Sequence, residues 1–189
     1  MQELSLNILD IAQNSIRANA SLITIEIIRS VIDNKMTITI EDNGCGMSKE
    51  KVEQVINPFF TTRTTRPVGL GVPFFKMSAE MTGGTFRIES EEGVGTKVIA
   101  TYVLDHIDLM PLGDMASTMV TLISVNPEID FIYRYRYNDA EFTLDTREVK
   151  QILEGLPVNS PDVLVFIKSF IEEDVYKRQV LKQALLKCL

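Results

Sequence analysis

Residues 38–51, ITIEDNGCGMSKEK, contain the connection that decides the fold. The Asn43-Gly44 pair follows an alternating apolar run, which is the usual sign of a hairpin turn between two strands. No second strand follows, because Ser48 has the character of a helix N-cap and the next residues repeat at helical spacing until Pro58. The stretch therefore predicts a strand, a loop containing glycines and a helix.

The residues around this loop alternate between the helical and the strand periodicity. Apolar side chains recur at helical spacing before and after the loop, and at period two in the runs between. The expected elements are a helix over 3–20, strands over 22–28 and 35–41, a helix over 49–57, a loop over 57–71, a helix over 72–82 and two strands between 85 and 104. This first unit, 1–104, ends near Leu104.

The composition changes after residue 104. A linker-like run is followed by a helix over 116–126, a hairpin across Asn138-Asp139 and helices near 146–155 and 160–172. These elements predict a small α+β appendage over 105–173, of unknown role. The tail over 174–189 contains DVYKRQ, which resembles adaptor-derived sequence, so the tail need not be native.

Composition and charge exclude several classes of function. The 189-residue chain has a net charge of −7, without the basic stripe that nucleic-acid binding requires. No apolar run approaches the roughly 18–20 residues of a membrane span, and the N-terminus has no export signal. Cys45, Cys188 and a single histidine cannot form a structural zinc site. We therefore expect a cytoplasmic protein with free thiols, bound to neither nucleic acid nor membrane.

Two places in the first unit carry candidate binding residues. Asp10 and Asn14 are four residues apart, so they share one helix face and could meet one ligand. Asp42 ends a strand and offers a carboxylate acceptor, while Gly44 and Gly46 permit close backbone approach by a flat ring. Each place also has an ordinary explanation, namely a solvated helix face and a strand-to-helix connection that uses glycines only for conformation.

A third candidate is the Gly69-Leu70-Gly71 sequence before a helix. Helix N-termini expose unpaired N–H groups, and glycines let a phosphate approach them. Arg63 is close in sequence and could meet phosphate oxygens, although ordinary surface charge explains it as well. The sequence is neither a Walker A loop nor a Rossmann turn, since the lysine and the preceding strand are both missing.

Taken in order, five stretches resemble the N, G1, F, G2 and G3 boxes of the GHKL ATPase family: LDIAQNSIRANA, EDNGCGM, NPFFTTRTT, GLGVPFF and GVGT. The family includes gyrase-type topoisomerases, heat-shock chaperone ATPases, histidine kinases, mismatch-repair ATPases and anti-sigma serine kinases. The resemblance covers about residues 4–104. It implies an α+β two-layer sandwich of the Bergerat type, with helices on one face of a mostly antiparallel sheet.

The resemblance also implies roles for individual residues, with ATP and Mg²⁺ as the cofactors. Asn14 would hold Mg²⁺ against the phosphates, Asp42 would receive the adenine amino group, and Thr96 would support that contact or a bridging water. The glycines would line the nucleotide, with Gly44 and Gly46 flanking the ring and Gly69 and Gly71 facing the phosphates. Residues 57–71, including Arg63, would form a short ATP lid.

Asp10 is the residue that suggests whether bound ATP is consumed. Histidine kinases usually have no carboxylate four residues before the N-box Asn, whereas the hydrolysing members and serine kinases carry one, generally Glu. An ionised carboxylate can orient a water or hydroxyl for attack on the γ-phosphate. We therefore expect ATP hydrolysis or phosphate transfer to a partner protein, in the manner of a serine kinase rather than a complete histidine kinase, whose phosphoacceptor helices have no room before the N-box helix.

Two further expectations concern assembly. The alternative to turnover is a non-catalytic regulatory module, in which ATP closes the lid and the residues after 105 present a surface to a partner. The lack of preceding elements leaves an open sheet edge, which a second copy of the chain could cover.

Overall fold

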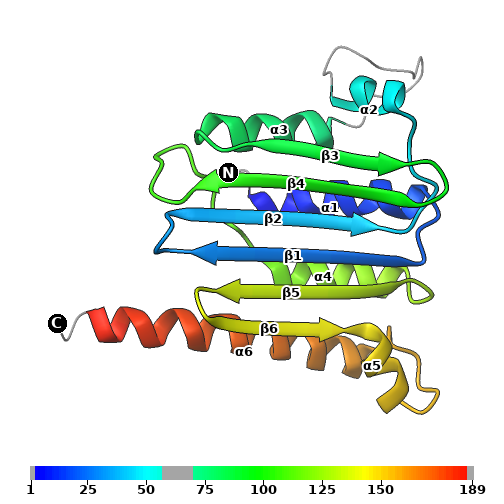
Figure 1. The fold of residues 1–189 in the computed structure, drawn as a ribbon. Helices are drawn as coiled ribbons and strands as arrows, with labels where there is room; N and C mark the ends of the chain where they lie inside the picture. Colours follow the sequence, from blue (N-terminus) through cyan, green and yellow to red (C-terminus); the bar gives the residue numbers. More distant parts are fainter. Residues whose placement is uncertain (1–2, 57–69, 187–189) are drawn as a thin grey trace.

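The computed structural model describes the backbone of residues 3–56 and 70–186, and the side chains of these residues up to 173. Six strands form one mixed sheet in the order β3-β4-β2-β1-β5-β6 (Figure 1). Their bounds are β1 (Leu22–Ser30), β2 (Lys35–Asp42), β3 (Phe86–Glu91), β4 (Gly95–Val103), β5 (Asp130–Tyr137) and β6 (Ala140–Asp145). All neighbouring strands are antiparallel except β1 and β5, which are parallel.

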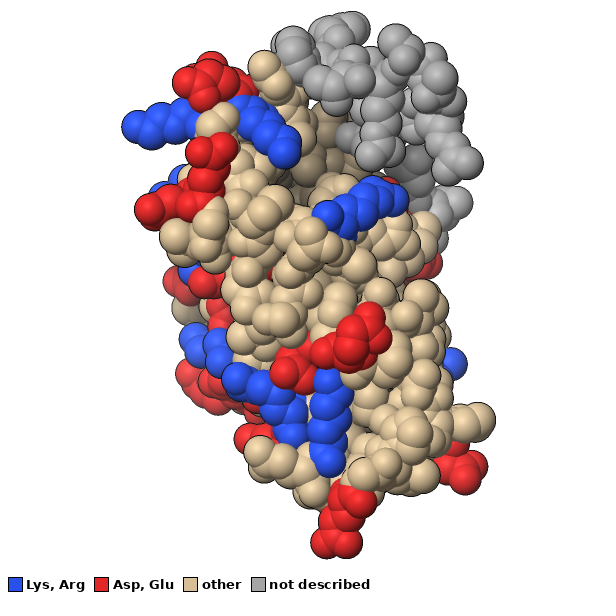
Figure 2. Space-filling view, turned by 90° about the vertical axis from the view of Figure 1, so that its right-hand side faces the viewer, with Lys and Arg blue, Asp and Glu red and all other residues tan. Residues whose placement is uncertain are grey.

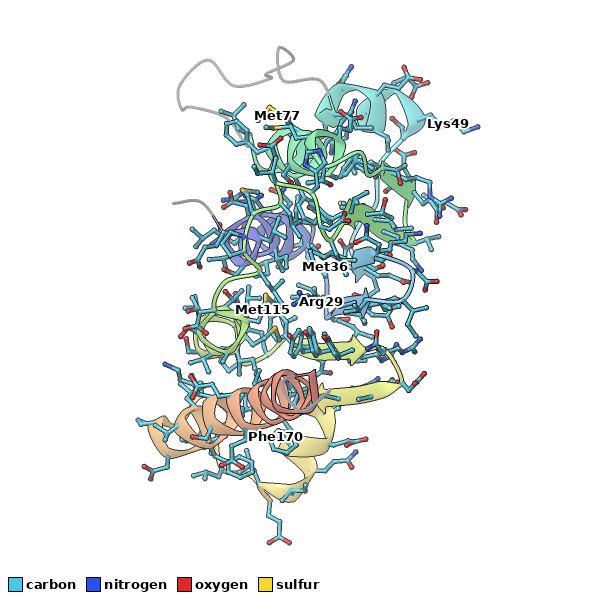
Figure 3. All side chains as sticks on the ribbon, turned by 90° about the vertical axis from the view of Figure 1, so that its left-hand side faces the viewer. Arg29, Met36, Lys49, Met77, Met115 and Phe170 are labelled. Atoms are coloured by element: carbon cyan, nitrogen blue, oxygen red, sulfur yellow. The ribbon has the colours of Figure 1, made fainter. Side chains whose placement is uncertain are left out.

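The described helices lie on one face of this sheet, and the other face is open (Figures 1 and 3). In chain order they are α1 (Leu4–Arg17), α2 (Lys49–Ile56), α3 (Gly71–Met81), α4 (Met115–Val125), α5 (Thr146–Ile152) and α6 (Pro161–Leu186). The predicted two-layer α+β sandwich is confirmed. The predicted helix over 160–172 is longer than expected, because α6 continues to Leu186.

Strand alternation explains which face is covered. In β1, Ile23, Ile25 and Ile27 are fully buried beneath the helices, while the residues between them face the open side. The same register buries Phe131 and Tyr133 of β5, which pair with Ile23 and Ile25. At about 1.5–3 kcal/mol for each large side chain removed from water, this shared layer is a main source of stability.

The sequence suggested that the residues after 104 form a separate unit. In the structure they do not. Their hairpin, β5 and β6, extends the sheet of the first unit, and one hydrophobic cluster includes side chains from both parts. β1 is not an edge strand, because β5 of the same chain pairs with it, and the edges of the described sheet are β3 and β6. The expectation that a second copy covers an open edge stays a prediction. Sequence periodicity identified these strands correctly but carries no information on which strand they pair with.

Three buried tyrosines differ in how their hydroxyl groups are satisfied. Tyr102 Oη lies 3.2 Å from Ser78 Oγ, which itself donates to the Phe75 carbonyl. Tyr133 and Tyr135 are equally buried, but their hydroxyls have no partner among the described residues. Burial raises the pKa of both Tyr102 and Tyr133, since the charged phenolate is poorly solvated there.

This difference yields a matched pair of substitutions. We expect Tyr133→Phe to raise the free energy of unfolding by about 1 kcal/mol, because it removes a desolvated hydroxyl without losing a protein hydrogen bond. Tyr102→Phe should lower it by about 0.5–1.5 kcal/mol, because its hydrogen bond with Ser78 is lost. Urea denaturation measures both values, and equal losses in the two variants would contradict the assignment.

Candidate functional site

Asp42 is the last residue of β2, and both of its carboxylate oxygens are held by the protein. Oδ2 accepts a hydrogen bond from Ser15 Oγ at 2.5 Å, and Oδ1 accepts one from the Gly44 N–H at 2.9 Å. Ser15 lies on α1, so the carboxylate links the helix layer, the end of the sheet and the following loop. Its orientation is therefore fixed before any ligand binds.

The loop over 43–48 is attached to the elements on both sides of it. The Asn43 side-chain oxygen accepts from the N–H groups of Ser21 and Leu22, each at 2.9 Å, at the start of β1. The Cys45 N–H donates to the Ala18 carbonyl at 2.9 Å, just after α1. The Asn43 side chain thus satisfies backbone N–H groups at the start of β1. Asn43 is not part of a hairpin turn, in agreement with the prediction from the sequence.

A second set of bonds ties the loop to the hairpin between β3 and β4. The Met47 N–H donates to Ser90 Oγ at 2.9 Å, and Ser90 Oγ lies 2.8 Å from Thr96 Oγ1. Thr96 is the cross-strand partner of Asp42, as its predicted supporting role requires. Its hydroxyl contacts Ser90 rather than the carboxylate, so its support of Asp42 stays a prediction.

The two loop glycines have a structural reason as well as the predicted one. A Cβ atom at Gly44 would lie 2.8 Å from the Ala18 carbonyl oxygen. Gly46 has φ +64°, and a Cβ there would overlap the Glu91 carbonyl. These close approaches explain both glycines, while their expected contact with a flat ring stays a prediction.

Asp10 lies beside the start of α3. A Cβ atom at Gly71 would come within 2.9 Å of Asp10 Cβ, so the glycine permits this approach of α1 and α3. Asp10 is exposed, and Asn14 one turn later is half-buried with its oxygen accepting from Arg17 at 3.1 Å. The structure therefore brings the predicted carboxylate and Gly71 together, next to the N–H groups of a helix N-terminus.

Some predicted positions lie outside the described residues. Arg63 and Gly69 are among them, as is most of the predicted lid over 57–71. Within the described residues, no group of three or more His, Cys, Asp or Glu side chains could hold a metal ion.

A hollow of about 570 Å³ lies at the same end of the sheet. Residues of the open face and of the β3–β4 turn line it together with four residues of the site, Asp42, Asn43, Ser90 and Thr96. Lys97 there bonds Glu41 at 2.9 Å, and this bond raises the lysine pKa. Asp42 is one of the lining residues, and the groups that hold its carboxylate come from α1 and from the loop after β2. Figure 2 views this end and shows acidic and basic side chains around a largely uncharged centre.

Ser15 and Ser90 are the site residues that the sequence did not single out. Ser15 is 4% exposed although it stands among the apolar positions of α1. A polar residue on the buried stripe of a helix needs a hydrogen-bond partner, which is the signal that could have identified it. Ser90 gave no comparable signal, because its partners come from other segments.

Residues 1–106 match the family model described as histidine kinase-, DNA gyrase B- and HSP90-like ATPase. The chain belongs to this family. No helix within the described part of this GHKL protein is long and apolar enough to cross a membrane.

Curated relatives of this GHKL chain include a sporulation kinase and a sensor protein. It is 34% identical to sporulation kinase D of Bacillus subtilis over 94 residues, which is 50% of this chain and 18% of that protein. It is 39% identical over 70 residues to sensor protein RprX of Bacteroides fragilis, covering 34% of this chain and 14% of the relative. The chain thus spans less than a fifth of the length of these relatives.

Among solved structures, one similar to this chain is the Aquifex aeolicus MutL ATPase domain complexed with ADP. The TM-score is 0.45 at 19% identity, covering 78% of this chain and 67% of the other.

The contrast between two glycines tests the packing of the loop. Gly46 and Gly93 both have positive φ, at 64° and 78°, but a Cβ at Gly93 would have nothing within 4 Å. We expect Gly93→Ala to cost about 1–2 kcal/mol of unfolding free energy from backbone strain alone. Gly46→Ala should cost clearly more, because the loop must also move away from Glu91. Thermal or urea unfolding compares them, and equal costs would show that the close approach is unimportant.

Proposed function

We propose that the protein is a cytoplasmic Mg-ATP-binding protein that hydrolyses ATP or transfers its γ-phosphate to a partner protein. The observation that carries the proposal is the fixed Asp42 carboxylate at the end of β2, in a chain that belongs to the GHKL family. The similarity to sporulation kinase D supports phosphate transfer as the form of turnover.

The adenine contact follows from the chemistry of this carboxylate. An ionised carboxylate offers about four acceptor sites, and Ser15 and Gly44 use one on each oxygen. Acceptor capacity therefore remains for the exocyclic amino group of adenine. Gly44 and Gly46 keep the adjacent backbone free of side chains, which suits a flat ring.

The phosphate end of the nucleotide would lie toward Asp10, Asn14 and the start of α3. The N-terminal N–H groups of α3 favour negative charge, and Gly71 adds no side chain beside them. Asn14 would hold Mg²⁺ through its side-chain oxygen, and the bound ion would neutralise charge on the phosphates. Arg63 and Gly69 would complete this end from the lid.

Asp10 is the residue proposed to act in turnover. Its exposed carboxylate lies on the same helix face as Asn14 and beside Gly71. There it can accept a proton from a water or from a partner's hydroxyl as that oxygen attacks the γ-phosphate.

The second candidate is a regulatory module that binds ATP without consuming it. The extension after residue 106 favours it, since β5 and β6 lie outside the family match yet complete the same sheet. Such an extension could report nucleotide binding to a partner without any chemistry.

ATP binding can be tested with a matched pair of neighbouring carboxylates. At about 100 times its dissociation constant, Mg-ATP should stabilise the wild type by about 2.7 kcal/mol, seen as a rise of roughly 5–10 °C in Tm. Asp42→Asn should abolish the rise, because the amide places a donor against the adenine amino group. Glu41→Gln should retain it, because Glu41 pairs with Lys97 on the open face. Absence of a shift in the wild type would refute ATP binding.

Turnover is tested separately at Asp10. We expect Asp10→Asn to keep the ATP-dependent Tm shift and to lower phosphate release or partner labelling by about 10²- to 10⁴-fold. The assay uses [γ-³²P]ATP with purified protein and with native extract. Equal rates for variant and wild type would contradict the role of Asp10 as base. Binding without release or labelling in the wild type would favour the regulatory module.

A further inference from the structure

We propose that the protein forms a two-fold symmetric dimer in which β6 pairs antiparallel with β6 of a second copy, giving one continuous sheet across both subunits. The inference goes beyond nucleotide binding and starts from the two edges of the sheet. β3 and β6 are the outermost strands of the described part, so each has one side that pairs with no strand there.

The two edges are protected very differently. β3 reads FRIESE, with Arg87, Glu89 and Glu91 all exposed, and α2 packs beside it. Charged side chains and a covering helix are the usual means of preventing edge-to-edge pairing. β6 reads AEFTLD, with neither proline nor lysine and with Phe142, Thr143 and Leu144 uncharged in its centre. The acidic side chains of β6, Glu141 and Asp145, lie toward its ends, and α5 follows at its C-terminal end (Figure 1). The centre of the β6 edge therefore lacks the usual protection.

Aromatic side chains extend from β6 to the surface. The Phe142 ring lies 5.1 Å from that of Phe170, which stacks on Phe166 at 5.9 Å with an interplanar angle of 10°. Phe142 is buried, whereas Phe170 and Phe166 are 41% and 63% exposed. α6, which carries both, lies at the β6 end of the helix layer, and Figure 3 shows Phe170 on its lower side. Exposed aromatic pairs of this kind are typical of the buried centre of an interface.

The arrangement of charges on β6 selects a second copy and a register. In a two-fold pairing centred on Phe142, Glu141 lies opposite Thr143 of the partner subunit. Like charges then face each other only at the ends of the pairing, where Asp145 lies opposite Asp139 of the partner subunit, a residue of the turn before β6. A two-fold centred on Thr143 would place Glu141 opposite Asp145 of the partner subunit, which is unfavourable. Pairing of β6 with β3 of another copy would generate an open filament, which the charged and covered β3 edge opposes.

The size of this contact predicts its affinity. Each subunit contributes a six-residue strand edge and two partly exposed phenylalanines. This is at the lower end of stable interfaces, which bury about 1,200–2,000 Å² in total. We therefore expect a dissociation constant on the order of micromolar.

Substitutions at Thr143 separate pairing from folding. Thr143 faces Arg134 within its own subunit and, in the proposed register, Glu141 of the partner subunit. Thr143→Glu should raise the stability of the subunit, because the new carboxylate lies opposite Arg134. It should weaken the dimer about tenfold, because that carboxylate also faces Glu141 of the partner subunit, and the two-fold axis repeats this repulsion. Thr143→Lys should disfavour the fold slightly but keep or strengthen the dimer. Changes in Tm and in dimer affinity thus have opposite signs.

Sedimentation equilibrium of the full chain at about 1–100 µM tests the proposal. The wild type should approach twice the 21.3 kDa chain mass, and Phe166→Ser should weaken the dimer about tenfold. A monomer at every concentration would overturn the proposal and leave this edge to a strand of another protein. Equal effects of Thr143→Glu and Thr143→Lys, or no effect of Phe166→Ser, would overturn it in favour of a different surface.

Discussion

The site depends on one hydrogen-bonded group, the Asp42 carboxylate. This carboxylate accepts a hydrogen bond from the Ser15 hydroxyl in the helix layer and another from the Gly44 N–H in the loop. Asp42 itself is the last residue of the central strand β2. A buried or half-buried carboxylate without donors is costly, so helix, loop and strand are all held in the arrangement that satisfies it. The same arrangement leaves acceptor positions free, which makes one group both a structural link and a recognition element.

Much of this fold could be predicted from local patterns. The period of two in β1 and β2, the helical spacing of α1 and the capped helix after the glycine loop each require only a few neighbouring residues. The sequence predicts conformational freedom at both loop glycines, but Gly46 alone of the two has positive φ, whereas Gly44 allows only the close approach to Ala18. The clustering of Asp10 with Gly71 followed from the family resemblance rather than from spacing, because the two residues are far apart in sequence.

Other features could not be predicted, because they depend on which segments meet. β5 has the same alternation whether it forms a separate hairpin or joins β1, so nothing local distinguishes the two arrangements. The hydroxyls of Ser15 and Ser90 form hydrogen bonds with residues of distant segments, so their roles cannot be inferred from neighbouring residues. The family match ends at residue 106, whereas the strand that covers β1 begins at Asp130. The residues after 106 therefore contribute to the same hydrophobic core as the region that matches the family.

The parallel pairing of β1 with β5 also has a consequence for biosynthesis. Ile23 pairs with Phe131, so β1 has left the ribosome long before its partner exists. At 5–20 residues per second, the roughly 100 intervening residues take about 5–20 s to translate. During that interval the apolar β1–β2 hairpin has an unpaired side, and the nascent chain is most exposed to aggregation and to chaperone capture.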